Sequence, residues 1–536
     1  MNNNLGLYIE KIDSIILKIK DGLVSKYNLK NVNVKQIIDT HQTGFHKYAW
    51  LFSYNELIKS VYKFNVESKD NHLKQIIFLT TLYFLQKLLY GINLNQVEST
   101  RLDEYREFIS ENDLNYVYNK YLKFDLTNEP INRHFAENNT NFFSFIDDKF
   151  DLYVSELKSY VDKNVIPRAQ SIHINNELIP DDIIQSLAKM EVFSANISKK
   201  YCGLELNKNI QSAITEELSR GYIGVGSLIT RNDIASELII NYGTEKQKYD
   251  YLPKIANGSI LPTAAFTESN SGSDLSSIST SVTKKIINGV KNYIVNGEKT
   301  WITHGSRSDL VVLLARTNSK ENGYKGLSLF IFKKTRGDQN NEFPDKGISG
   351  SEIKVIGYRG MKSYSIKFED YQIPEDSLLG IEENVGFKQL MTTFENARIQ
   401  TASRSNGLSK RAFELAYNYA KNRIQFGESI FTFPRIFQKL QNIFLNIVGS
   451  KIYNLHVTDN YNHSVGNQLS SSITKMLCSN YCWVNSDISF QIHGSYGYAQ
   501  EYEISRILCD SRIMSIFEGS SEIQAGLIAK QIFKND

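Results

Sequence analysis

The sequence is poor in proline, in cysteine and in long apolar runs. Eight prolines in 536 residues favour long regular elements joined by few rigid linkers. The four cysteines are too few for a disulfide-built scaffold, and they fit a reducing compartment such as the cytoplasm. Cys478 and Cys482 stand four residues apart without a second pair at ligand spacing, so we expect two small buried residues and no metal site.

A strong excess of charge of one sign is also absent. The formal net charge is +3 at pH 7, which gives no general drive toward nucleic acid or anionic lipid, although it leaves local phosphate sites open. The most apolar run, residues 76–92, is interrupted by Gln86 and Lys87 and falls short of the roughly 18 uncharged residues of a membrane span. We therefore expect no membrane span and no signal peptide, and we interpret the run as a buried helix that ends near Gly91.

The patterning divides a chain that is too long for one core. Apolar residues recur at helical spacing along most of the chain, for example Phe150, Tyr153, Leu157 and Val161. The third quarter instead has short strand-like runs with NG turns at 288–289 and 296–297. A polar, turn-rich stretch at 128–141 is the expected linker. The predicted parts are a helical extension (1–140), a helical domain (141–262), a β domain (263–380) and a helical bundle (381–536). In the bundle, Phe413, Ala416, Tyr417 and Ala420 form an apolar stripe that is expected to end near Gly427.

The order of elements excludes the usual nucleotide-binding turn. Strands do not alternate with helices, and GYIGVG at 221–226 has its glycines in the wrong spacing and follows a helix, so a helix break is expected there. No phosphate-loop lysine motif is found either. Any bound nucleotide must be held in another way.

Three short segments could carry chemistry. AAFTESNSGSDLSS at 264–277 offers small residues, hydroxyls and backbone N–H groups, although such a cluster is more often a surface loop. GEKTWITHGSRSD at 297–309 holds Trp301, which suits the core or a planar ligand. IFEGSSEIQ at 516–524 holds Glu518, which is either a helix-terminal acid, worth about 0.3–1 kcal/mol, or a base.

FTESNSGSD and GEKTWIT, in register with four further segments, resemble the acyl-CoA dehydrogenases, flavoenzymes that oxidise the α,β C–C bond of acyl thioesters. The further segments are NYGTEKQKYDYLPKIANG, NRIQFGESI, QIHGSYGY and CDSRIMSIFEGSSEIQ, and the resemblance covers residues 142–536. HKYAWLFSYNELI and YGINLNQVESTR in the extension are similar to the branch that oxidises methylsuccinyl-CoA to mesaconyl-CoA, as are TESNSGSD, GYRGMKSY and FENARIQTA.

The resemblance implies a multi-domain α+β fold and a set of roles. It implies a helical domain, a central β-barrel-like domain and a C-terminal four-helix bundle, here preceded by an extra helical domain, with FAD across a subunit boundary. It places cofactor contacts at Phe266, Thr267, Ser273, Trp301, Ile302, Thr303, Arg423, Gln425, Gln491, Gly494, Ser520 and Glu522, and substrate contacts at Ser273, Glu395, Arg398 and Gly519. Arg423 and Gln425 could instead be a solvated helix end, and Glu395 with Arg398 a plain helix pair.

Glu518 is the proton-accepting glutamate that the resemblance implies, with flavin N5 as hydride acceptor. Some members carry the base immediately before the arginine of FENAR, where this chain has Ala397, which cannot accept a proton. The sequence also departs from the family at Ser269, Pro434 and Ser495, where the family commonly has proline, glutamine and glycine. The serine should loosen the flavin loop, and the proline puts an adenine contact in doubt.

Four functions follow in decreasing order of expectation. The first is a methylsuccinyl-CoA dehydrogenase activity that passes electrons to an electron-transfer flavoprotein, in a homodimer or homotetramer. A generic short- or branched-chain acyl-CoA dehydrogenase, an acyl-CoA oxidase and a non-catalytic binding protein are the alternatives. The partner of a substrate carboxylate stays open: Arg307 and Arg359 are candidates, each better explained as structural. The role of residues 1–140 also stays open, as a cover for the active site or as a subunit contact.

Overall fold

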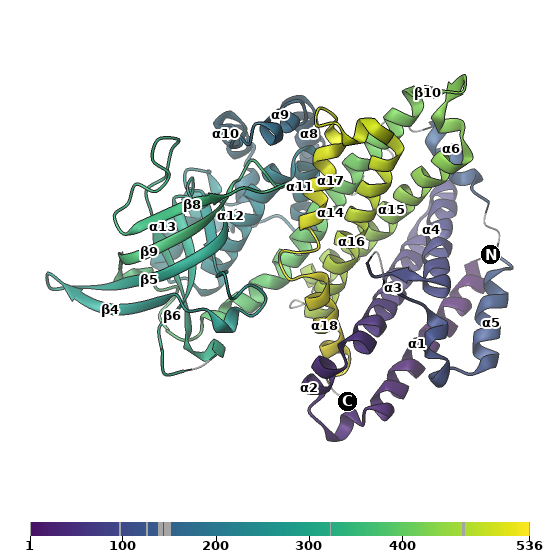
Figure 1. Ribbon diagram of the computed structural model, residues 1–536, viewed down its shortest axis with the longest axis horizontal. Coiled ribbons are helices and arrows are strands. Elements are labelled where there is room, and N and C mark those ends of the chain that lie inside the picture. Colours follow the sequence, from purple (N-terminus) through teal and green to yellow (C-terminus); the bar gives the residue numbers. More distant parts are fainter. Residues whose placement is uncertain are drawn as a thin grey trace. The chain divides into compact units, whose positions relative to one another are not determined.

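The computed structural model describes residues 2–95, 98–124, 127–137, 143, 152–321, 323–463 and 467–534. Contacts divide the chain into two compact units, each drawn in Figure 1. Unit 1 comprises Met1–Phe150, Thr401–Tyr498 and Met514–Asp536, and unit 2 comprises Asp151–Gln400 and Ala499–Ile513. The long helix α14 (Gly386–Asn422) contributes residues to both units.

Helices form the N-terminal part of unit 1, as predicted. They are α1 (Asn2–Lys26), α2 (Val34–Thr40), α3 (Gln42–Glu67), α4 (Asn71–Tyr90), α5 (Glu111–Tyr121) and α6 (Glu129–Glu137). The apolar run at 76–92 lies in α4, which begins at the capping side chain of Asp70 and ends where Gly91 adopts φ 144°. Among the described residues, no helix combines the length and the apolar character that crossing a membrane requires.

The rest of unit 1 is a bundle of helices. It contains the second half of α14, α15 (Pro434–His463), α16 (Gln468–His493), α18 (Ser521–Ile532) and a small hairpin of β10 (Ile424–Gln425) and β11 (Glu428–Ser429). The predicted apolar stripe of α14 is buried, although the helix ends at Asn422, five residues before Gly427. Cys478 and Cys482 are both buried on α16, as expected for small core residues.

The N-terminal helices pack directly on this bundle. The ring of Phe45 on α3 meets Phe533 edge-on with centroids 5.2 Å apart. The ring centroid of Tyr481 on α16 lies 6.3 Å from that of Tyr54 and 5.7 Å from that of Phe84. Figure 1 shows α3 and α4 running beside α15 and α16. The extension therefore shares one core with the bundle.

The predicted linker at 128–141 is wrong over most of its length. Residues 129–137 form α6, and residues 138–141 lie outside the described part of the chain, as does Phe150. Phe135 explains the error, because its buried ring packs against Phe413, Tyr417 and Phe444 of the bundle. Two large apolar residues, Ile131 and Phe135, are a weak sequence signal in a polar segment, but their burial stabilises the helix against the bundle.

Unit 2 begins with helices. They are α8 (Leu152–Tyr160), a π-helical turn (Val161–Val165), α9 (Ile166–Ile174), α10 (Asp181–Lys189), α11 (Lys208–Gly221), α12 (Ile223–Tyr242), α13 (Glu245–Ala256) and, much later in the chain, α17 (Glu503–Ile513). The predicted break at GYIGVG is confirmed, because Tyr222 is extended between α11 and α12. The Thr244 and Gln247 side chains form a capping box that starts α13.

Seven strands form the sheet of unit 2. They are β3 (Pro262–Ala265), β4 (Ser281–Ile287), β5 (Val290–Thr303), β6 (Leu310–Arg316), β7 (Leu327–Lys333), β8 (Ile348–Ile353) and β9 (Ser363–Pro374). The strand order is β3-β6-β4-β5-β9-β8, with β7 paired to β6. The pairing is antiparallel except where β3 and β4 meet β6.

The two predicted NG turns have different outcomes. Asn288 and Gly289 both have positive φ and connect β4 to β5 as a hairpin, as predicted. The second pair, at 296–297, lies inside β5, so the prediction of a turn there is wrong. Gly297, at φ 140°, instead sits at a shift in the register with β9.

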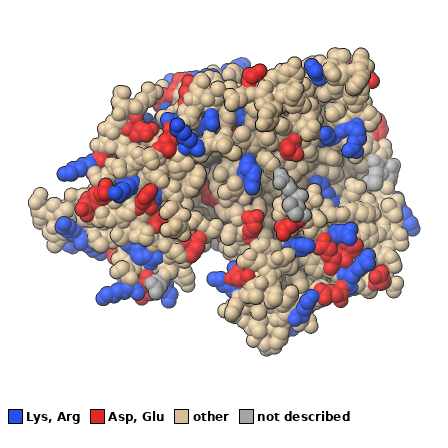
Figure 2. All heavy atoms as spheres, in the orientation of Figure 1, with Lys and Arg blue, Asp and Glu red and all other residues tan. Residues whose placement is uncertain are grey.

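Both faces of β6 are buried, which explains its continuous apolar run LVVLLA. Alternate residues of that strand face two separate cores: Leu310, Val312 and Leu314 join one, and Val311, Leu313 and Ala315 join the other. The first core also contains residues of α12 and α13. On the visible surface, basic and acidic side chains are interspersed (Figure 2), in keeping with the small net charge.

Candidate active site

The segment 266–273 leaves β3 and turns at once. Glu268 and Ser271 exchange two backbone hydrogen bonds, of 3.1 and 3.0 Å, which close a four-residue turn with Ser269 and Asn270 at its centre. The turn presents Thr267 on one side, half-buried, and leaves Ser273 exposed. Phe266 packs against the core between the sheet and α12, so the loop is anchored from below.

A buried ion pair joins this loop to β5. Lys299 Nζ lies 2.8 Å from Glu268 Oε1 and also donates to the Phe266 carbonyl at 3.0 Å. The Glu268 carboxylate further accepts from the N–H groups of Ser279 and Thr280. Burial opposes the ionised form of Glu268, but Lys299 and these donors prevail and hold its pKa at about 2. Burial lowers the pKa of Lys299 to about 8.

The same region holds Trp301 in an unusual conformation. Thr300 N donates to Thr267 O at 2.9 Å, which places Trp301 beside the loop. Trp301 has φ 60° within a shift of register between β5 and β9, and its side chain is 57 % exposed. Positive φ is rare for a bulky residue, and a large exposed indole is rarely left in water. The strand thus holds a planar ring outward, and it is followed by the buried Ile302 and the half-buried Thr303.

Glu518 lies in a tight loop of unit 1 before α18. It adopts φ 53° and Gly519 adopts φ 86°, so two successive residues are left-handed. Ser520 is the N-cap of α18, accepting from Ile523 N, and Glu522 is the acidic residue of its first turn. Glu518 therefore precedes the cap and does not occupy the helix-stabilising position that the structural alternative required.

Phe517, the residue before Glu518, contacts a large and fully buried side chain, Arg404 of α14. The Arg404 guanidinium lies 4.7 Å from the ring centroid of Phe517, and it donates to Thr401 Oγ1 at 2.9 Å. A guanidinium keeps its charge when it is buried, so Arg404 brings a cation next to Phe517. No feature of the sequence near Arg404 marked it, because Phe517 is distant along the chain.

Three predicted positions lie on the part of α14 that belongs to unit 2. Ala397 is buried and carries no acid, as the sequence requires. Burial raises the pKa of Glu395, which is half-buried, against the opposing charge of Arg398 one turn later. Arg398 itself is buried. The pair is therefore more than a solvated helix pair.

Another predicted group gathers at one corner of unit 1. Arg423 follows α14, and its guanidinium lies 5.5 Å from the ring centroid of Tyr496. Tyr496 belongs to the turn Gly494–Tyr498, which follows Gln491 and ends α16. Stacking of Tyr419 on His493, with centroids 4.4 Å apart, joins α14 to α16 beneath the corner. The hairpin that carries Gln425 also exposes Phe426 by 95 %.

The two arginines considered for a substrate carboxylate are engaged elsewhere. Arg307 donates to the Ile179 carbonyl and pairs with Asp181, and it is buried. Arg359 donates to the carbonyls of Val355 and His173 at 2.9 and 2.8 Å. Both arginines tie loops of unit 2 together, so the structural interpretation holds for each.

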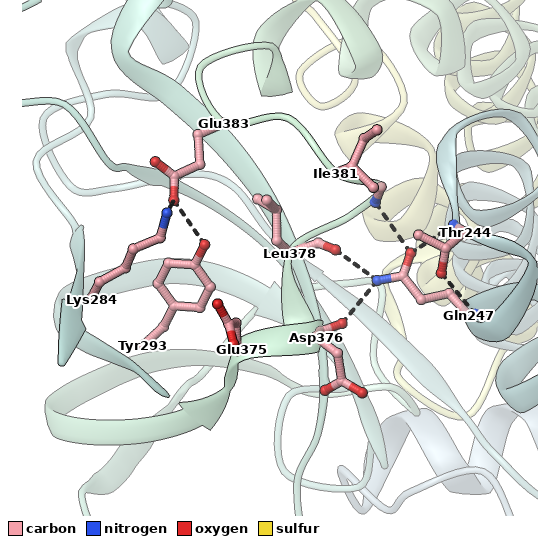
Figure 3. Close-up of a pocket in the computed structure, with 10 residues that line it drawn as sticks. Thr244, Gln247, Lys284, Tyr293, Glu375, Asp376, Leu378, Ile381 and Glu383 are labelled. Atoms are coloured by element: carbon pink, nitrogen blue, oxygen red, sulfur yellow. Dashed lines mark hydrogen bonds and ion pairs between the residues drawn. The ribbon is translucent and has the colours of Figure 1, made fainter. Parts of the chain in front are cut away.

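A cavity of about 400 Å³ opens in unit 2, and it is separate from every predicted residue. Figure 3 shows nine of its ten lining residues by name: Thr244, Gln247, Lys284, Tyr293, Glu375, Asp376, Leu378, Ile381 and Glu383. The Gln247 amide donates to the carbonyls of Asp376 and Leu378 and accepts from the N–H groups of Thr244 and Gly380. The polar side chains of the cavity therefore hold the start of α13 against the segment that follows β9. In the described part of the chain, no cluster of three or more His, Cys, Asp or Glu could hold a metal.

Comparison with known proteins agrees with this architecture. Family models described as acyl-CoA dehydrogenase N-terminal, middle and C-terminal domains match residues 148–259, 263–371 and 384–533. The (2S)-methylsuccinyl-CoA dehydrogenase of Cereibacter sphaeroides is 36 % identical over 98 % of this chain and 96 % of its own length. An acyl-CoA dehydrogenase of Bacillus subtilis is 29 % identical over 70 % of this chain and 96 % of its own.

Solved structures give the same result. Butyryl-CoA dehydrogenase from Megasphaera elsdenii matches with a TM-score of 0.66 and 25 % identity, over 72 % of this chain and 99 % of that one. Acyl-CoA dehydrogenase from Geobacillus kaustophilus matches with a TM-score of 0.65 and 27 % identity, over 71 % and 97 %. The observed order of helical, β and helical parts agrees with the order of the three matched domains. The chain therefore belongs to the acyl-CoA dehydrogenase family, a family of flavoproteins, and is an oxidoreductase acting on CH–CH bonds.

Proposed function

We propose that this enzyme oxidises methylsuccinyl-CoA to mesaconyl-CoA. The observation that carries the proposal is similarity along the whole chain, extension included, to the methylsuccinyl-CoA dehydrogenase of Cereibacter sphaeroides. The other relatives described above align with about 70 % of the chain, so they support the chemistry of the family but not this particular substrate. A generic short- or branched-chain acyl-CoA dehydrogenase is the alternative.

Glu518 is the proposed proton acceptor. It would take the proton from the carbon next to the thioester carbonyl, while a hydrogen of the adjacent carbon leaves as hydride. Its position supports this role, because it precedes the cap of α18 and so does not act as a helix-terminal acid. The competing position, Ala397, has no acid, and Glu268 is committed to Lys299. Gly519 beside it leaves room for a thioester to approach the backbone.

FAD is the proposed cofactor, and it would supply the hydride acceptor when bound. The residues fit a planar, anionic group: Trp301 holds out an exposed indole beside Thr267, with Ile302, Thr303 and Ser273 in the same two segments. Arg423 offers a guanidinium suited to a pyrophosphate, beside Gln425 and the turn after Gln491. Ser520 and Glu522 begin α18 after the Glu518 loop and are the further cofactor contacts that the family resemblance implies.

A second copy of the chain is the proposed cover for the corner that carries Arg423. Phe426 and Tyr498 are 95 % and 86 % exposed there, which is unusual for large apolar side chains in water. Covering them in a homodimer or homotetramer would bring the Arg423 corner to another copy's cofactor. Electrons would then pass to an electron-transfer flavoprotein. A related Acetobacterium woodii protein is described as a subunit of a caffeyl-CoA reductase–Etf complex.

Arg404 is the group we propose to meet the free carboxylate of a dicarboxylyl substrate. It is fully buried, and its guanidinium stacks on the residue that precedes Glu518. A guanidinium binds a carboxylate through two parallel hydrogen bonds, which a methyl terminus cannot accept. Glu395 and Arg398 are proposed to contact the CoA part, and Gly519 the acyl thioester, as the family resemblance implies. The enzyme is proposed to work in the cytoplasm, in keeping with four free cysteines.

A panel of acyl-CoA thioesters tests the substrate. Methylsuccinyl-, butyryl- and isovaleryl-CoA are compared for kcat/KM with an artificial electron acceptor, and oxygen consumption without that acceptor tests for an oxidase. We expect methylsuccinyl-CoA to be preferred at least tenfold, and Arg404→Met to abolish that preference. Preference for butyryl- or isovaleryl-CoA would defeat the substrate assignment. A colourless protein that FAD cannot reconstitute would defeat the enzymatic function as a whole.

A further inference from the structure

The loop that carries Glu518 is held in a conformation that it would not adopt alone. Glu518 and Gly519 have φ angles of 53° and 86° in succession. Such angles are common for glycine but unfavourable for a residue with a side chain. At Gly519 a Cβ atom would lie 2.3 Å from Gln524 Nε2, so glycine is needed for space as well as for φ. The surrounding structure must therefore fix this loop.

Lys475 supplies one of these restraints. It lies on α16, its side chain is fully buried, and its Nζ donates to the Gly519 carbonyl at 2.6 Å. Forty-four residues separate the two along the chain, so this contact is tertiary and fixes the loop to another helix. A hydrogen bond from a charged donor is stronger than one between neutral groups.

Gln524, which follows the loop in the sequence, supplies a second restraint. It lies one turn into α18, is fully buried, and its Nε2 donates to the Glu518 and Gly519 carbonyls at 3.1 and 3.4 Å. Ser521 N donates to Ser515 O at 3.2 Å, which closes the loop at its base. The carbonyls on both sides of the Glu518–Gly519 linkage thus point toward buried donors.

We propose that Lys475 and Gln524 are positioning residues for the proton-abstraction step: together they fix the backbone of the loop that carries Glu518. This inference rests on the proposed role of Glu518 as the base. The Lys475 ammonium holds the Gly519 carbonyl, and the Gln524 amide holds the carbonyls of Glu518 and Gly519. A base whose backbone is fixed in this way meets the reacting carbon in a defined geometry.

Two variants test these restraints. In Lys475→Met and in Gln524→Leu, we expect kcat to fall about tenfold or more at neutral pH. KM should change less than about threefold in both, because the loop acts on the reacting carbon and not on the CoA part. Lys475→Arg keeps a charged donor on α16 and should restore most of the lost kcat.

Lys451→Met is the matched control, since Lys451 is also a buried lysine of the bundle and lies on α15. Its kcat should equal that of the wild type. Amide hydrogen exchange of residues 515–521 provides a readout independent of turnover, and it should accelerate in Lys475→Met and Gln524→Leu but not in Lys451→Met. If Lys475→Met does not fold, Gln524→Leu with Lys475→Arg still tests the proposal through exchange and kcat.

Wild-type kcat and exchange in Lys475→Met and Gln524→Leu, together with an inactive Glu518→Gln, would overturn this inference and leave the proposed function standing. Near-normal turnover in Glu518→Gln would instead overturn the proposed function.

Discussion

Two fully buried lysines, one in each unit, each fix one loop, and they do so differently. Lys299 in unit 2 meets the carboxylate of Glu268, whereas Lys475 in unit 1 donates to the carbonyl beside Glu518. Glu268 is bound by its lysine and two backbone N–H groups, and its pKa is held at about 2. A carboxylate held in this way is a poor proton acceptor. The contrast assigns a structural role to Glu268, whereas Glu518 is the proposed base.

The largest expected effect comes from replacing Glu518. Glu518→Gln should reduce kcat by about 10²–10⁴-fold, because the amide cannot accept the α-proton. The unfolding midpoint and the FAD content should match the wild type, since Gln has the same shape. Rapid-mixing measurements of flavin reduction by the thioester provide the test. Turnover within about threefold of the wild type would show that the base lies elsewhere.

Breaking the ion pair of unit 2 should instead act on stability. Lys299→Met leaves the Glu268 carboxylate buried beside an apolar chain, which should cost about 3–5 kcal/mol in the free energy of unfolding, measured in urea. Adding Glu268→Gln removes the unpaired charge and should recover most of that loss. If the double variant is no more stable than Lys299→Met, the pair is not the source of the effect.

Acid should reveal the same ion pair without any mutation. The pKa of Glu268 is about 2 in the folded protein, against an ordinary value of 4.5. Between these values the unfolded chain binds more protons, so the contribution of Glu268 to stability is complete above about pH 4.5 and is lost as the pH falls toward 2. Unfolding midpoints measured from pH 6 to pH 3 should fall less steeply for Glu268→Gln. Parallel curves would contradict the assignment.

The smallest expected effect concerns the turn closed by Glu268 and Ser271, which lies beside Trp301. Ser269 is the second residue of the turn closed by Glu268 and Ser271, where proline is favoured, and its φ is not positive. Ser269→Pro should therefore raise the free energy of unfolding by about 0.4–1 kcal/mol, through a less flexible unfolded chain. Thermal unfolding is the measurement, with Asn270→Pro as the control that should not stabilise. A destabilised Ser269→Pro would mean that the serine N–H is needed.

The sequence predicted elements whose signals are local. The helix end near Gly91 and the helix break within 221–226 both follow from neighbouring residues, and both are confirmed. Helix α6 and the second NG pair were misjudged, because the burial of Phe135 and the register shift at Gly297 depend on distant segments. The four-part division of the chain remains a prediction.

The candidate site shows the same limit. The residues that the family motifs mark, such as Thr267, Trp301 and Glu518, were reachable from sequence because they lie within short recognisable segments. Lys475, Gln524 and Arg404 were not predicted. Lys475 and Arg404 act on the loop from 44 and more than 100 residues away, and Gln524 looks like any polar residue of a helix. Their roles arise from tertiary packing alone.

The contact of α3 with α18 also constrains how the chain can be synthesised. Phe45 and Tyr48 pack against Phe533, and Asp39 pairs with Lys530 at 2.5 Å, although nearly 500 residues lie between them. At about 5–20 residues per second, a ribosome exposes the first helices for tens of seconds before their partners emerge. During that interval an apolar surface faces the cytosol without its native cover. Nascent-chain folding of this enzyme should therefore depend on chaperones that shield the extension until synthesis reaches α18.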